Sequence, residues 1–144
     1  MSEEIRLSVK SGAVRGIREH SMEAYPHECC GALLGRDTQV REVCALLPLV
    51  NRRDDSPKNR FSLSAADVVA AEAAAESQGL HVVGWYHSHP DCPAQPSEYD
   101  REHALPWYSY VIVSVREGVA RELTSWRLND NRERYTEERV ELQP

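Results

Sequence analysis

The residues best suited to chemistry are concentrated in one short stretch, GWYHSHPDCPAQPSEYD, which covers residues 84–100. It begins with aromatic residues and two histidines that are separated by a single position. If this part forms a β-strand, His87 and His89 project from the same face and can present their imidazole nitrogens to one cation. Ser88 then points to the opposite face, and we interpret it as a structural strand residue. The spacing predicts a two-histidine metal site on a rigid strand.

A third ligand has to come from beyond this strand. The segment PDCPAQP turns the chain, so that Ser97 begins a short helix and Asp100 lies one turn into it. The same residues also have a purely structural interpretation, because SxxD is close to a helix capping box and two histidines can fill a polar patch. The combination of both motifs at this spacing favours a metal site.

The patterns around this stretch predict the elements that position it. Apolar residues at helical intervals predict a first helix in residues 8–24, which ends before Pro26. Two apolar segments, 29–35 and 40–50, predict paired strands joined by a short polar turn. Capping residues, β-branched runs and turn signals predict a capped helix in 61–79, a buried strand in 80–89, a short helix in 96–105, strands in 107–115 and 119–129, and an edge strand in 136–142. The order of elements predicts a mixed α/β domain.

Length and composition restrict the class of protein. A chain of 144 residues suits a single domain, residues 1–144, and no apolar run approaches the ~18 residues of a membrane span. The net charge of −6 argues against a nucleic-acid partner that binds through a broad basic face. The acidic start, MSEEIRLSVK, lacks the apolar core of a signal peptide, and four cysteines in such a chain suggest reduced thiols. We therefore expect a cytoplasmic protein without a membrane partner.

The pattern HxHPxxxxxxSxxD in residues 87–100 resembles the signature of the JAMM (MPN-plus) zinc metalloprotease family. That signature also has an upstream glutamate just before the first central strand, where this chain has Glu28 in YPHECCGALLG. PHECCGALLG, NRR and GWYHSH further resemble the small bacterial members of the family. The resemblance implies a single JAMM (MPN, cytidine-deaminase-like) fold: a mixed curved sheet flanked by two main helices, with a short helix after the HxH strand.

The same resemblance implies a catalytic site. His87, His89 and Asp100 would hold one Zn²⁺ per chain and leave the fourth position to water, which is the arrangement of catalytic zinc. Zinc lowers the pKa of such a water from 15.7 to about 7. Glu28 would accept the water's proton and later deliver it to the leaving amine, and Ser97 would donate a hydrogen bond to the oxyanion. The implied reaction is direct hydrolysis of a peptide or isopeptide bond.

The short chain resembles the minimal members of the family, whose substrates are ubiquitin-like sulfur-carrier proteins. This resemblance implies cleavage after the carrier's C-terminal Gly-Gly, with release of a cysteine, peptide or other adduct. The basic loop 51–61 could contribute to recognition, because a tail can add to a sheet edge while cationic side chains pair with carboxylates. Those cations are Arg52, Arg53, Lys58 and Arg60.

Three other interpretations of the sequence compete with a JAMM enzyme. A non-catalytic MPN scaffold is one, but such members have usually lost ligands that this chain keeps. A zinc site with cysteine ligands is another, yet Cys29 and Cys30 are adjacent on a strand and point in opposite directions. Zinc-dependent base deaminases require HxE and PCxxC, whereas this chain has HSH and DCPAQ.

Overall fold

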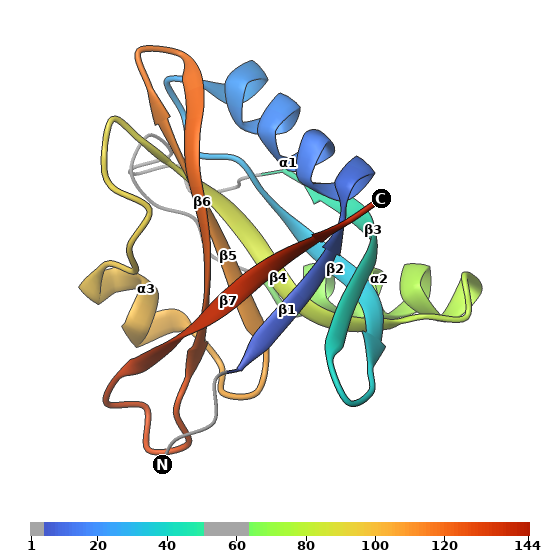
Figure 1. Cartoon of the computed structure of the whole chain (residues 1–144). Coiled ribbons are helices and arrows are strands. Elements are labelled where there is room, and N and C mark those ends of the chain that lie inside the picture. Colours follow the sequence, from blue (N-terminus) through green and yellow to red (C-terminus); the bar gives the residue numbers. More distant parts are fainter. Residues whose placement is uncertain (1–4, 51–63) are drawn as a thin grey trace.

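The computed structural model describes residues 5–50 and 64–144, so the basic loop 51–61 lies outside the described residues. Figure 1 shows the chain coloured from the N-terminus to the C-terminus. The elements within these ranges are β1 (Arg6–Lys10), α1 (Ser11–Ala24), β2 (Cys30–Asp37), β3 (Arg41–Leu49), α2 (Ala65–Ser77), β4 (His81–Pro90), α3 (Glu98–His103), β5 (Ser109–Arg116), β6 (Val119–Leu128) and β7 (Tyr135–Gln143). No helix among the described residues is long and apolar enough to cross a membrane.

The strands form one strongly curved sheet in the order β1-β3-β2-β4-β5-β6-β7. β1 pairs in parallel with both β3 and β7, so the curved sheet returns on itself. The pair β4 and β5 is also parallel, and the remaining neighbours are antiparallel. This arrangement confirms the expected mixed, curved sheet, and it places the histidine-bearing strand β4 between β2 and β5.

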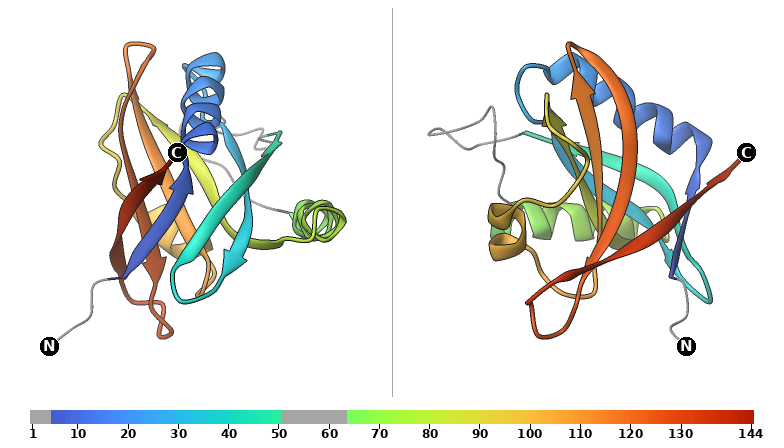
Figure 2. Two further views of the ribbon diagram at one scale, coloured as in Figure 1. Left: turned by 45° about the vertical axis from the view of Figure 1, so that its right-hand side comes forward. Right: turned by 60° about the vertical axis from the view of Figure 1, so that its left-hand side comes forward.

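Two hydrophobic clusters lie on opposite faces of the central strands. Leu33 on β2 belongs to the cluster that α1 covers, whereas its neighbours Ala32 and Leu34 belong to the cluster that α2 covers. Figure 2 shows α1 and α2 on different sides of the β2 to β4 region. The capping box predicted at the start of α2 is present, since Ser64 and Asp67 exchange two hydrogen bonds. The two main helices therefore hold the central strands from both sides.

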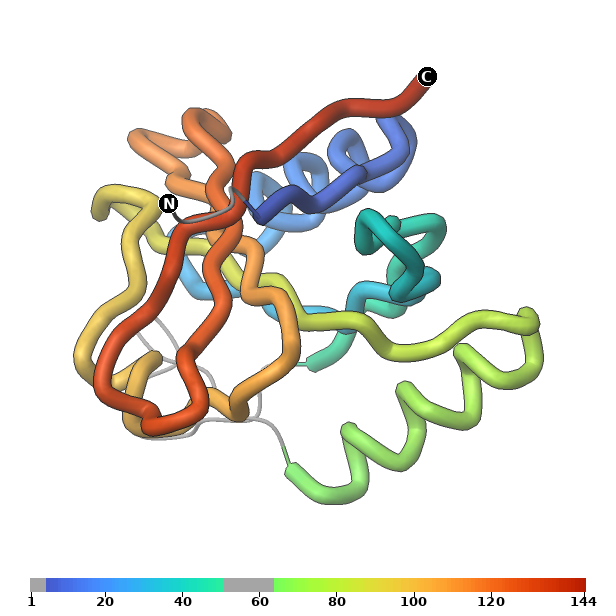
Figure 3. Tube along the Cα trace, turned by 60° about the horizontal axis from the view of Figure 1, so that its bottom comes forward, coloured from blue at the N-terminus to red at the C-terminus, as the bar shows by residue number. Residues whose placement is uncertain are grey.

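Two local predictions were wrong. The expected helix over 8–24 begins only at Ser11, because Leu7 and Val9 alternate with Ser8 and are buried in strand β1. The segment 136–142 is no edge strand, since β7 pairs with β6 on one side and with β1 on the other. Figure 3 shows β7 running beside β1. Both errors arise from the pairing of the two ends of the chain, which local patterns do not encode.

Gly84 lets β4 and β5 approach closely where their pairing begins, three residues before His87. A Cβ atom built on Gly84 would collide with the carbonyl oxygen of Ser109 on β5. We expect Gly84→Ala to destabilise the fold by about 1–3 kcal/mol, because the obstacle is backbone that cannot rotate away. The control is Gly12→Ala on α1, whose added Cβ would meet nothing nearer than the Arg15 side chain at 3.9 Å. Urea unfolding measures both, and equal midpoints would contradict this close packing.

Candidate metal centre

Strand β4 places the two histidines at the C-terminal end of the central part of the sheet. His87 pairs with Cys30 of β2 and Ile112 of β5, and His89 pairs with Ser114 of β5. As the period of a strand requires, both rings project from one face, and their Nε2 atoms lie 3.0 Å apart. β4 is paired with β5 at both histidines and with β2 as far as His87, so it forms a rigid base for the two side chains.

Asp100 reaches the same point from the first turn of α3. The Asp100 amide donates to the hydroxyl of Ser97 at 3.0 Å, and the Ser97 amide donates to Oδ2 of Asp100 at 2.8 Å. The same Oδ2 atom lies 3.3 Å from Nε2 of His87 and 3.1 Å from Nε2 of His89. The capping box and the cluster are thus one arrangement, since the cap aims the carboxylate at the histidines.

The two Nε2 atoms and Oδ2 of Asp100 are spaced like three ligand atoms of a tetrahedrally coordinated cation. They form a triangle with sides of 3.0 to 3.3 Å, and ligand atoms bonded to tetrahedral zinc at 2.0–2.1 Å lie about 3.3 Å from one another. Among the described residues, this is the group of histidine, cysteine and acidic side chains that could hold a metal ion. Two imidazoles and one carboxylate also match the donor types that zinc prefers.

Burial and mutual contact set the protonation of the cluster. Burial lowers the pKa of His87, although the neighbouring Asp100 opposes this shift. Burial alone would raise the pKa of Asp100, but its contacts with His87 and His89 lower it by more, to well below the ordinary range. A neutral imidazole beside an ionised carboxylate is the state that a metal ion needs in its ligands.

The turn between β4 and α3 fixes the orientation of His89. Its Nδ1 lies 2.9 Å from the carbonyl oxygen of Pro93, and because a carbonyl only accepts, Nδ1 carries the proton and Nε2 offers its lone pair. Two strand hydroxyls hold the turn by donating to its carbonyl groups, Ser114 to Cys92 at 2.5 Å and Thr124 to Ala94 at 2.6 Å. Sequence reasoning missed these partners, since lone hydroxyls on strands carry no recognisable spacing.

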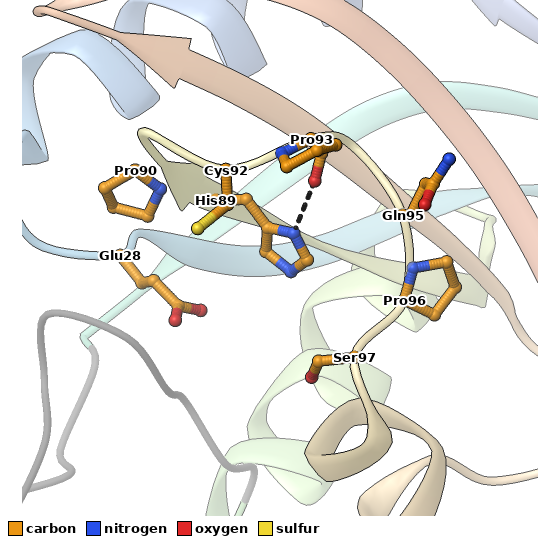
Figure 4. A pocket seen from close by; sticks show the side chains of 8 residues that line it. All are labelled: Glu28, His89, Pro90, Cys92, Pro93, Gln95, Pro96 and Ser97. Carbon is orange, nitrogen blue, oxygen red and sulfur yellow. Dashed lines mark hydrogen bonds between the residues drawn. The ribbon is translucent and has the colours of Figure 1, made fainter.

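Glu28 lies beside this cluster in a pocket of about 320 Å³. Its exposed fraction is 4%, although a glutamate after a Pro-His pair would ordinarily lie at the surface. Figure 4 shows the carboxylate of Glu28 and the hydroxyl of Ser97 on two sides of the space in front of the His89 ring. The five residues singled out from the sequence therefore lie around one pocket and its adjoining cluster.

The cysteines do not join the candidate ligands. Burial raises the pKa of Cys29 to about 11 and that of Cys30 to about 12, so both are thiols at neutral pH. Cys92 lines the pocket but is not part of the histidine and aspartate cluster found among the described residues. This arrangement argues against the alternative of a cysteine-bearing zinc site, because the thiolate is the form that binds metal.

Comparison with known proteins gives consistent matches. A family model described as prokaryotic homologs of the JAB domain matches residues 10–129. A desampylase of Haloferax volcanii is 39% identical over 114 residues, which cover 76% of this chain and 81% of the relative. A CysO-cysteine peptidase of Mycobacterium tuberculosis is 31% identical over 137 residues, 94% of this chain and 90% of the relative. The solution structure of a Desulfitobacterium hafniense protein has a TM-score of 0.82 at 30% identity, covering 95% of this chain and 92% of that one.

The curved mixed sheet, with its histidine and aspartate group at the end of the central strand, defines a JAB/MPN domain. The chain belongs to the family of prokaryotic homologs of the JAB domain. It is a hydrolase of the class that acts on peptide or isopeptide bonds, to which both named relatives belong. The expected fold and family are thereby confirmed.

Proposed function

We propose that this chain is a zinc-dependent peptidase or isopeptidase, with zinc held by His87, His89 and Asp100. The triangle of ligand atoms, matched in size to tetrahedral zinc, is the observation that carries the proposal. JAB-domain proteins are zinc-dependent in general, which supports the choice of metal. A zinc ion bound there would supply the Lewis acidity that makes a water nucleophilic near neutral pH.

Two side chains would carry out the proton transfer and charge stabilisation. Glu28 would take the proton from the attacking water and return it to the leaving amine, which its burial in the pocket beside the cluster supports. Ser97 accepts its hydrogen bond from the Asp100 amide, so its own proton stays available for the oxyanion of the tetrahedral intermediate. The capping box would thus both orient a ligand and leave one donor for catalysis.

The substrate we propose is a conjugate of a ubiquitin-like sulfur-carrier protein, cleaved after its C-terminal Gly-Gly. Its support is the named activity of the relatives, which act on conjugates of ubiquitin-like proteins, together with the resemblance to minimal family members. The released group would be a cysteine, a peptide or another adduct. We further propose that residues 1–144 act as one domain in the cytoplasm.

Hydrolysis of a carrier adduct tests this function directly. The zinc-loaded protein should remove a cysteine or lysine-containing peptide from the C-terminal glycine of a ubiquitin-like carrier, which mass spectrometry detects as the loss of the adduct's mass. A chelator should stop the reaction, and added zinc should restore it, because the site needs its metal. Less than about 0.2 zinc per chain after metal-replete purification, an occupancy too low for a site that depends on its metal, would contradict the proposal.

A further inference from the structure

The segment that carries Glu28 is attached near both ends, to strand β4, which carries the two histidines, and to the turn that follows it. It connects the end of α1 at Ala24 with the start of β2 at Cys30. Residues in such a connection belong to no helix or strand, so contacts with other parts of the fold have to fix their position. Here the contacts come from two residues close to His89, one just before it on β4 and one shortly after it in the turn.

The first attachment joins Ser88 to Cys29, the residue next to Glu28. The Cys29 amide donates to the hydroxyl oxygen of Ser88 at 2.9 Å, and the Ser88 amide donates to the carbonyl of Cys29 at 3.2 Å. Ser88 is fully buried and lies between the two histidines, on the face of β4 that points away from them. A two-point contact of this kind fixes both the distance and the rotation of the peptide next to Glu28.

The second attachment joins Tyr25 to Asp91 at the other end of the segment. The hydroxyl of Tyr25 donates to Oδ2 of Asp91 at 2.7 Å, and the amide of Glu117 donates to Oδ1 at 2.9 Å. The amide of Asp91 donates to the carbonyl of Val115 at 2.6 Å, so the aspartate is itself fixed to β5 and to the turn after it.

We propose that Ser88 and Asp91 are positioning residues for Glu28, holding its carboxylate at a set distance from the metal. Ser88 and Asp91 lie on either side of His89 in the sequence. The segment that carries Glu28 is therefore bonded to the same stretch of chain that carries the histidines, and a shift of this stretch would move Glu28 and the histidines together. This role differs from the structural strand residue that the sequence suggests for Ser88. The inference rests on the proposed function, in which Glu28 is the base.

Ser88→Ala tests the first attachment, because it removes the acceptor and leaves the strand unchanged. We expect kcat to fall by at least about 10-fold, since small displacements of a catalytic group cost on the order of 10²-fold. KM and the zinc affinity, measured by competition with a chromogenic chelator, should stay unchanged. NMR should show faster hydrogen exchange at the Cys29 amide. Ser21→Ala, which removes another buried serine hydroxyl from α1, is the matched control and should leave kcat unchanged.

A second pair of variants separates positioning of Glu28 from general damage. In a Glu28→Gln background, Ser88→Ala should cause no further loss of the residual rate, because the residue acts through the base that is already absent. Tyr25→Phe removes only an exposed hydroxyl and should lower kcat in the same Glu28-dependent way. An equal loss in both backgrounds, a parallel loss of zinc affinity, or an unchanged kcat in Ser88→Ala would overturn the inference. A fully active Glu28→Gln protein would instead overturn the assignment of the base.

Discussion

Glu28→Gln should slow hydrolysis of a carrier adduct by orders of magnitude, to about 10²–10⁴-fold below the wild-type rate, while leaving the zinc in place. The amide has nearly the shape of the carboxylate but accepts no proton at neutral pH, so the attacking water loses its base and the leaving amine its acid. Proton transfer by a positioned side chain contributes about 10²–10⁴-fold, and we expect kcat to fall within that range. Single-turnover hydrolysis measures the rate, and elemental analysis of the purified variant measures the zinc.

The matched control for this variant is Glu23→Gln. Glu23 is close to Glu28 in the sequence and lies near the end of α1. Its side chain is exposed and does not line the pocket. The control should keep the wild-type rate and zinc content. A Glu28→Gln protein that turned over normally would show that another group is the base. If the variant lost its zinc as well, Glu28 would be contributing to the metal site rather than to proton transfer alone.

The parts of the site that could be predicted from the sequence are those that depend on local geometry. The two-residue period of a strand places His87 and His89 on one face, whatever the rest of the fold does. The Ser97 and Asp100 spacing defines a capping box, and the structure shows that this box is what aims the carboxylate at the histidines. The structural explanation and the metal site, which compete in the sequence, are therefore compatible in the folded chain.

The parts that could not be predicted depend on contacts between distant residues. Ser114 on β5 and Thr124 on β6 donate hydrogen bonds to the turn between β4 and α3. These bonds can form only when the two strands lie beside that turn. The same holds for Tyr25 and Asp91, which are 66 positions apart in the chain. Strand β1 was missed for a related reason, because its pairing with β3 and β7 joins both ends of the chain. Only the tertiary fold brings these groups together.

Asp100→Asn should weaken zinc binding by more than about 100-fold. Loss of a residue that only supports a metal ligand costs about 10–100-fold in metal affinity, and replacing a charged ligand itself should cost more. Asparagine keeps the size of the side chain and can still accept from the Ser97 amide, so α3 should persist. It removes the negative charge that balances the cation and that the two histidines stabilise on Asp100 against its burial. Competition with a chromogenic chelator measures the affinity, and thermal unfolding with and without zinc gives an independent measure.

The chain contains its own control for this variant, because α2 begins with the same motif. Asp67 accepts from the Ser64 amide at 3.2 Å and donates its amide to the Ser64 hydroxyl at 3.1 Å, the arrangement that Asp100 and Ser97 have in α3. Asp67→Asn should therefore cost comparable capping energy, of about 1 kcal/mol or less, without changing zinc affinity. At a free zinc concentration of 100 times Kd, binding stabilises the folded state by about 2.7 kcal/mol. The zinc-dependent rise in Tm should persist in Asp67→Asn. In Asp100→Asn the same zinc concentration should stabilise the folded state by no more than about 0.4 kcal/mol, so most of the rise should be lost. An equal rise in both variants would show that Asp100 only caps α3.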